Sequence, residues 1–175
     1  MTASSVEPPP EAFNFAAHLL DANAGRPNKA AFIDDAGAVT YGELDNRARR
    51  FAAALKERGV KREERALILM QDGAEWPVAF LGATLAGVVP VAVNTLLTTA
   101  DYDFMLRDSR ARALIVSDAL YDRFAPILAK QPALKQVVVA GTQPVDGRRA
   151  LAELLAAAAP KAKAAETSAD DVCFA

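Results

Sequence analysis

Few residues in this chain have the types and spacing that chemistry requires. Asp34 and Asp35 are adjacent carboxylates of the kind that bind metal ions or exchange protons, but a glycine follows them closely. Asp before Gly is typical of a hairpin turn, so we assign this pair no function. The segment Gly82–Gly87 has the two-glycine spacing of a phosphate-binding loop, but Val88 and Val89 follow where lysine and serine or threonine are required. We interpret its glycines as mid-helix residues packed closely against a strand.

Three other side chains lack the neighbours that catalysis needs. His18 lies on a mostly apolar segment, so we expect it to pack rather than act as a base. Cys173 has no histidine near it in sequence and is expected to be a buried strand residue. Trp76 is expected to anchor the start of an apolar helix rather than stack on a ligand. Without a G-x-G-x-x-G, G-x-S-x-G, C-x-x-C or H-E-x-x-H motif, the sequence predicts no catalytic residue and no metal ligand.

The composition is that of a globular protein without a disulfide. Of the 175 residues, 52% are hydrophobic and 24% are charged, and 20 Lys+Arg against 22 Asp+Glu give a net charge of -2. That balance offers no basic surface for nucleic acid. The single cysteine is typical of a reducing compartment, so we expect a cytoplasmic protein. The uncharged segment Val78–Val93 is too short, and too interrupted by glycine and proline, to be expected to span a membrane.

Hydrophobic periodicity predicts the elements that would position any site. Helices are predicted at 14–23, 40–59, 74–88, from 98 onward, 120–129 and 149–158, and two of them begin with the capping boxes Thr40/Glu43 and Thr98/Asp101. Strands are predicted at 30–34, 39–40, 65–70, 90–93, 112–116 and 136–140. This alternation predicts a doubly wound α/β lobe, with an open, mostly parallel sheet flanked by helices and preceded by a small hairpin.

The two ends of the chain depart from this alternation. Residues 1–11 are acidic and proline-rich, lack the features of a signal peptide, and are predicted to form a disordered tail. The lobe is predicted to span residues 12–159. Residues 160–175 are predicted to be a linker and the start of another strand. Because the last five residues begin a strand pattern, we expect the chain to be a truncated part of a longer polypeptide.

Four motifs, in the right order between residues 14 and 140, resemble the adenylate-forming superfamily of acyl-CoA synthetases, luciferases and peptide-synthetase adenylation domains. They are Thr40-Tyr41-Gly42-Glu43-Leu44, Ala54-Leu55 through Gly59-Val60 to Glu64-Arg65-Ala66, Phe80-Leu81-Gly82-Ala83 through Val88-Val89-Pro90-Val91, and Asp108-Ser109-Arg110-Ala111-Arg112. The resemblance implies that the lobe is the N-terminal portion of the family's large, AMP-binding domain. Within the superfamily, Phe13–Ala16, Phe32–Asp35 and Asn94–Thr98 resemble benzoate-CoA ligases and their hydroxybenzoate relatives.

The resemblance implies an acid-thiol ligase that uses ATP, Mg²⁺ and CoA. Such an enzyme converts benzoate and ATP to an acyl-adenylate and pyrophosphate, then transfers the acyl group to the CoA thiol. It also implies that the Ser/Thr/Gly-rich phosphate loop, the aromatic-acid pocket and the catalytic lysine follow residue 175. We therefore expect this segment to be inactive alone, and expect its partners to be an aromatic carboxylic acid, ATP, CoA and the remainder of its own polypeptide.

One binding surface is predicted on this segment. The loop after strand 90–93 lies at the carboxyl end of a parallel strand, where doubly wound sheets place ligands. In related synthetases the equivalent loop lies near the pantetheine tunnel, which implies that Asn94, Thr95 and Leu96 contact CoA and that Arg123 offers charge to its phosphates. The alternatives are an ordinary loop before a helix and a solvated surface arginine.

Two other function classes compete with the ligase. The first is a non-catalytic α/β binding or scaffold module complete in itself. The second, a nucleotide-binding domain of dehydrogenase type, is disfavoured because the glycine fingerprint is missing. The ring substituents accepted and the oligomeric state leave no pattern in this segment.

Overall fold

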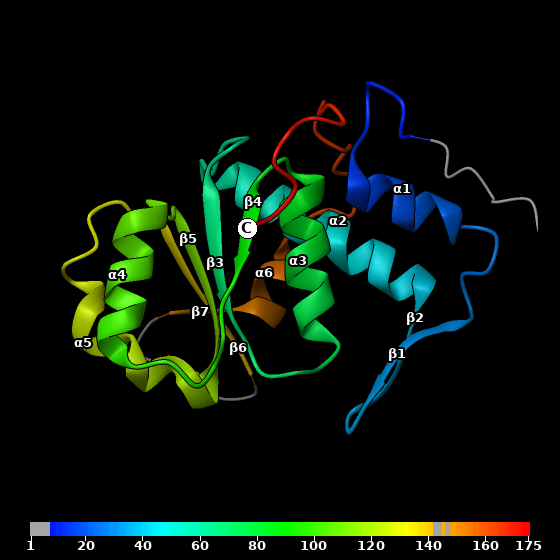
Figure 1. Ribbon diagram of the computed structural model, residues 1–175. Coiled ribbons are helices and arrows are strands. Elements are labelled where there is room, and N and C mark those ends of the chain that lie inside the picture. Colours follow the sequence, from blue (N-terminus) through cyan, green and yellow to red (C-terminus); the bar gives the residue numbers. More distant parts are fainter. Residues whose placement is uncertain (1–7, 142–144, 146–147) are drawn as a thin grey trace, which may run out of the picture.

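Five short segments form a single parallel sheet in the computed structural model, which describes residues 8–141, 145 and 148–175 (Figure 1). The strand order is β4-β3-β5-β6-β7, and every neighbouring pair is parallel. The strands are β3 (Arg65–Leu69), β4 (Val89–Ala92), β5 (Ala113–Ser117), β6 (Gln136–Ala140) and β7 (Arg149–Ala150). The predicted open parallel sheet is therefore confirmed.

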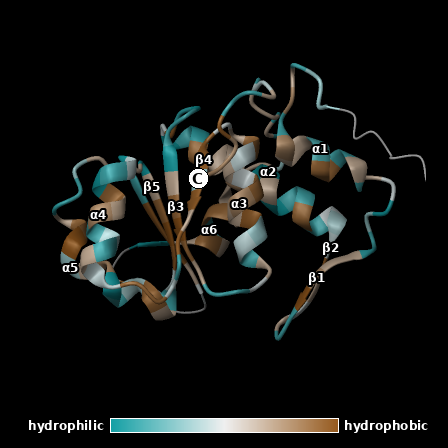
Figure 2. Ribbon diagram, in the orientation of Figure 1, coloured by the Kyte–Doolittle hydropathy of each residue, from teal (hydrophilic) through white to brown (hydrophobic). Residues whose placement is uncertain are grey.

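Helices cover both faces of the sheet, because its central strands are apolar on both sides. In β3, Ala66 and Ile68 belong to one hydrophobic cluster, whereas Leu67 and Leu69 belong to the other. On the first face lie α1 (Phe15–Ala22), α2 (Tyr41–Glu57), α3 (Glu75–Leu85) and α6 (Leu151–Ala157). On the second lie α4 (Thr99–Ser109), the 3₁₀ helix η1 (Asp118–Arg123) and α5 (Ala125–Leu128). In Figure 2 the central strands β3 and β5 are coloured mostly as hydrophobic.

Both predicted capping boxes are present. Thr40 N–H donates to Glu43 Oε2 at 2.8 Å, and Glu43 N–H donates to Thr40 Oγ1 at 3.3 Å. Thr98 and Asp101 make the same reciprocal pair at the start of α4. Each box satisfies two backbone donors that the first helical turn would otherwise leave without acceptors, so α2 and α4 begin at defined residues.

The predicted helix at 120–129 is instead divided into η1 and α5. Pro126 has no backbone N–H, so the hydrogen bond that would continue the helix across this point is absent. The predicted helix at 149–158 starts two residues later, because Arg149 and Ala150 pair with β6 as strand β7. Local periodicity favoured a helix at both places. The missing N–H of Pro126 interrupts the first helix, and pairing with β6 delays the start of the second.

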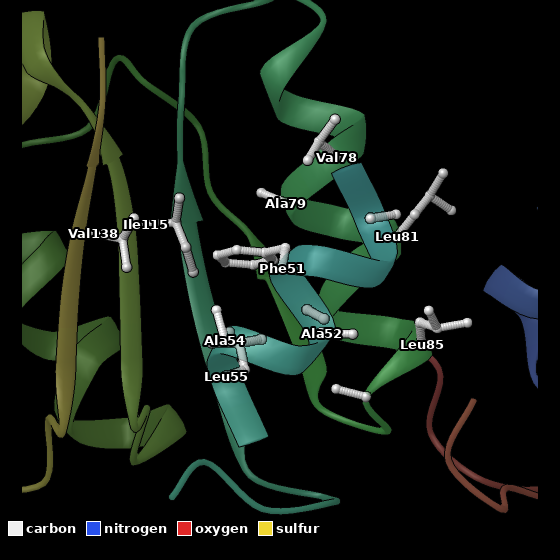
Figure 3. Close-up of a cluster of buried hydrophobic side chains, with 14 of the residues drawn as sticks. Phe51, Ala52, Ala54, Leu55, Val78, Ala79, Leu81, Leu85, Ile115 and Val138 are labelled. Atoms are coloured by element: carbon white, nitrogen blue, oxygen red, sulfur yellow. The ribbon is translucent and has the colours of Figure 1, made fainter. Parts of the chain in front are cut away.

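The two glycines at the ends of the segment Gly82–Gly87 have different structural roles, and neither packs against a strand. Gly82 lies within α3, where a Cβ atom would meet Ala48 O of α2 at 2.8 Å and Phe51 Cβ at 2.9 Å. The close packing is therefore helix against helix, and our prediction of a strand neighbour was wrong. Gly87 follows the C-cap of α3 with φ of +73°, so it ends the helix. Figure 3 shows Phe51 of α2 beside Ala79 of α3, facing Ile115 of the sheet.

The predicted hairpin is also present, with β1 (Ala30–Asp34) and β2 (Gly37–Thr40) paired antiparallel. Asp34 does more than form its turn. One carboxylate oxygen accepts from Ala36 N–H at 2.9 Å, and the other accepts from Ala74 N–H at 2.8 Å, just before α3. These two bonds, the one from Ala74 first, hold the pKa of the Asp34 carboxyl below its ordinary value. Asp34 thus joins the hairpin to the start of α3.

Asp34→Asn is expected to lower the melting temperature measured by circular dichroism, because the amide nitrogen cannot accept one of the two bonds. The adjacent Asp35→Asn serves as the matched control. Since the folded-state pKa of Asp34 is lowered, its contribution is full above the unfolded pKa of about 3.9 and is lost as pH falls through the folded value. The gap between wild type and Asp34→Asn should therefore close in acid. A gap that is absent at neutral pH contradicts this assignment.

Residues 1–7 of the predicted disordered tail lie outside the described residues. In the part of the chain that the structure describes, no helix combines the length and the hydropathy that a bilayer crossing requires.

Candidate functional site

The loop between β4 and α4 carries three of the four residues predicted to bind CoA. Asn94 Oδ1 accepts from Leu96 N–H at 2.8 Å, which closes a tight turn. On the side of the loop that faces the core, the hydroxyl of Tyr102 donates to the Asn94 carbonyl oxygen at 3.0 Å. Tyr102 is fully buried in α4 and stacks on Phe124, with ring centroids 4.9 Å apart. The loop is therefore held in shape by an aromatic pair in the core.

The structure brings the fourth predicted residue to this loop. Arg123, at the end of η1, is exposed, and its Nη1 donates to the carbonyl oxygen of Leu97 at 3.0 Å. Because η1 follows β5 and the loop follows β4, both lie at the carboxyl edge of the parallel sheet. Leu96 is 84% exposed, Asn94 is exposed and Thr95 is half-buried. These four residues form what we call the β4 loop surface.

The carboxyl edge also contains side-chain contacts that the sequence did not indicate. Ser117, the last residue of β5, accepts from Gln71 N–H at 2.9 Å and so ties β5 to the residues that follow β3. Burial raises the pKa of the Glu75 carboxyl, although the Arg47 guanidinium lies 3.3 Å from it and partly offsets this cost. No sequence motif marks these contacts, because each depends on residues 28 or more positions apart.

A cavity of about 700 Å³ opens beside the hairpin and includes Arg47 and Glu75 in its lining. It is separate from the β4 loop surface, because Asn94, Thr95, Leu96 and Arg123 do not line it. Among residues 8–141, 145 and 148–175, no three metal-ligating side chains gather into a group. The β4 loop surface is suited to holding a ligand through hydrogen bonds and the guanidinium charge of Arg123.

The isolated reactive side chains of the sequence have packing contacts. His18 lies against the ring of Phe13, with centroids 5.3 Å apart, and Trp76 stacks on Phe80 at 5.0 Å. Cys173 is half-buried rather than buried, and it lies outside the named strands, so the prediction of a buried strand residue was wrong. Burial raises the pKa of its thiol, which disfavours the reactive thiolate.

A family model described as AMP-binding enzyme matches residues 19–175, which is most of the chain. The chain belongs to the AMP-binding enzyme family. Its curated relatives in the family include a benzoate–CoA ligase of Thauera aromatica, 46% identical over 168 residues. That alignment covers 94% of this chain and 31% of the relative. The predicted superfamily is confirmed, and the chain is homologous to the N-terminal part of benzoate-CoA ligases.

Solved structures of AMP-binding ligases have the same fold. A benzoate CoA ligase from Burkholderia xenovorans LB400 is 52% identical with a TM-score of 0.84, over 93% of this chain and 32% of that one. An anthranilate CoA ligase in complex with anthranoyl-AMP is 32% identical with a TM-score of 0.91, over 95% of this chain and 32% of that one. The chain therefore spans about a third of the length of the relatives it matches.

Proposed function

We propose that this chain is the N-terminal part of an aromatic acid-CoA ligase of the cytoplasm. The ligase joins benzoate to the AMP portion of ATP, which releases pyrophosphate, and then transfers the benzoyl group to the thiol of CoA, which releases AMP. The observation that carries the proposal is that the chain is more similar in sequence to a benzoate ligase than to a fatty-acid ligase. The benzoate–CoA ligase of Thauera aromatica is 46% identical over 94% of the chain, whereas a medium- and long-chain fatty-acid ligase of Mycolicibacterium smegmatis is 30% identical over 72%.

The β4 loop surface fits part of a CoA site. Arg123 supplies a cation for a phosphate group, and the exposed Leu96 with the side-chain NH₂ of Asn94 offers an apolar and a polar contact to a pantetheine arm. CoA supplies the thiol that accepts the acyl group. We assign no residue of this chain to ATP or Mg²⁺, so the chemistry of the first step is expected to depend on the rest of the ligase.

A chimera tests whether this chain is a working ligase segment. We would replace the corresponding N-terminal segment of the Burkholderia xenovorans benzoate CoA ligase, to which the chain is 52% identical. The chimera is expected to form benzoyl-CoA, whereas the chain alone releases no pyrophosphate above a blank. As a matched control, the equivalent segment of the Archaeoglobus fulgidus fatty-acid ligase, 19% identical to this chain, should support less activity. A folded chimera no better than this control contradicts the proposal and favours a scaffold module.

Arg123→Ala is expected to raise the KM for CoA in the same chimera by about two- to fivefold, as removal of one exposed charged contact does. Pyrophosphate release from benzoate and ATP should not change. Arg123→Lys keeps the charge but not the planar donor pair, which separates the contact with CoA from the bond to Leu97. Lys130→Ala, an exposed cation after α5, is the control. An unchanged KM for CoA in Arg123→Ala refutes the assignment.

A further inference from the structure

The last eleven residues of the chain are held against other elements by hydrogen bonds, most of them between backbone groups. Ala165 N–H donates to Leu85 O at the end of α3 at 2.8 Å. Phe13 and Thr167 exchange two bonds, from Phe13 N–H at 2.9 Å and from the Thr167 hydroxyl at 2.7 Å. Ala169 N–H donates to Glu11 O at 2.9 Å. Figure 1 shows this segment, residues 165–175, running past the start of α1 and ending beside β4; we call it the terminal strap.

Side chains of Arg62, Ser168 and Asp171 form a cluster that holds the middle of the terminal strap. The Asp171 carboxylate accepts from the backbone N–H and the hydroxyl of Ser168, both at 3.1 Å, and it pairs with the Arg62 guanidinium. The bond from Ser168 N–H first, and then Arg62, hold the pKa of Asp171 below its ordinary value. At Gly87 a Cβ atom would lie 2.8 Å from Ala165 Cβ and 3.0 Å from Arg62 Cγ. The strap and the Arg62 stem therefore press closely on the turn before β4.

Beyond this cluster, the strap is aligned with the edge of the sheet. Ala175 N–H donates to Pro90 O at 3.0 Å, and Ala92 N–H donates to Ala175 O at 3.1 Å. Two bonds from one residue to positions two apart on its neighbour are the pattern of a parallel pair. A chain that continues in this direction runs beside β4 toward the carboxyl edge, where the β4 loop surface lies.

We propose that Arg62, Ser168 and Asp171 are positioning residues that fix the register of residues 172–175 on β4 and so direct the following polypeptide to the carboxyl edge of the sheet. This inference rests on the proposed function, because it places the rest of the ligase after residue 175. The adenylate-forming half-reaction depends on that placement, because we assign no residue of this chain to ATP or Mg²⁺ and the rest of the ligase must supply them. Transfer of a finished acyl-adenylate to CoA depends on it less, because the residues proposed to contact CoA already lie on the β4 loop surface of this chain.

Hydrogen exchange on this chain tests the register directly. Asp171→Asn and Arg62→Met are expected to speed exchange of the Ala92 amide by about three- to tenfold, because the bond to Ala175 opens more often. The neighbouring Val93 amide, which donates to Ile68 O, should keep its rate. Arg107→Met, which breaks a surface ion pair with Asp103, is the matched control. An unchanged rate at Ala92 in both variants overturns the proposal.

The chimera with the Burkholderia xenovorans ligase tests the consequence for catalysis. Asp171→Asn and Arg62→Met should slow pyrophosphate release from benzoate and ATP several-fold, whereas transfer from supplied benzoyl-AMP to CoA keeps its rate, and Arg62→Lys should restore most of the loss. Equal loss in both half-reactions indicates a purely structural role and overturns the inference. No loss in either also overturns it. An unmutated chimera without activity instead refutes the proposed function, so the two failures are distinguishable.

Discussion

Replacing Phe51 with alanine is expected to lower the free energy of unfolding by about 3–5 kcal/mol, the usual cost of removing a fully buried phenylalanine. Phe51 is 0% exposed and lies where α2, α3 and the sheet meet (Figure 3). The backbone of α3 passes close to it, because a Cβ atom added at Gly82 would lie 2.9 Å from the Phe51 Cβ. The surrounding helices cannot collapse fully into the cavity, so both the lost contacts and the cavity destabilise the fold.

Urea denaturation followed by circular dichroism measures this effect. Phe104→Ala is the matched control, because the same side chain on α4 is 60% exposed and its loss should change stability by no more than about 0.5 kcal/mol. Similar losses in the two variants would show that Phe51 is not at the centre of the core.

Gly82→Ala is expected to destabilise the chain by about 1–3 kcal/mol, although alanine favours a helix over glycine by about 1 kcal/mol. The added methyl would lie 2.8 Å from the backbone oxygen of Ala48, which cannot rotate away as a side chain could. Relief requires α3 to move away from α2, which breaks the densest helix contact on this face of the sheet.

Gly25→Ala is the control for this substitution, because a Cβ atom there has no heavy atom of the described residues within 4 Å. Thermal unfolding of the two variants side by side checks the prediction. A Gly82→Ala variant as stable as wild type would mean that the two helices pack less closely than the structure has them.

The elements that the sequence predicted well are those with local causes. Both capping boxes need only residues three apart, and β3 is recognisable because it is apolar on both faces. The parts that it did not predict have distant causes. The bond from Ala74 to Asp34 joins residues 40 apart, and the pair Arg62–Asp171 joins residues 109 apart. No local pattern marks either one.

The candidate site shows the same division. The position of Asn94, Thr95 and Leu96 after a buried strand indicates the carboxyl edge of a sheet, and the structure places them there. The bond from Arg123 to Leu97 depends on β4 and β5 lying on either side of β3, which only the fold determines. The bond from the Tyr102 hydroxyl to the Asn94 carbonyl likewise requires the loop to fold back over α4.

An acid panel tests most directly whether this chain is part of a ligase for aromatic acids. The measurement is pyrophosphate release by the ligase that carries this chain, supplied with ATP, CoA and one acid at a time. We predict that benzoate or a hydroxybenzoate gives the highest kcat/KM, well above hexanoate and palmitate. Highest kcat/KM with an aliphatic acid, or no pyrophosphate release with any acid, would contradict the account.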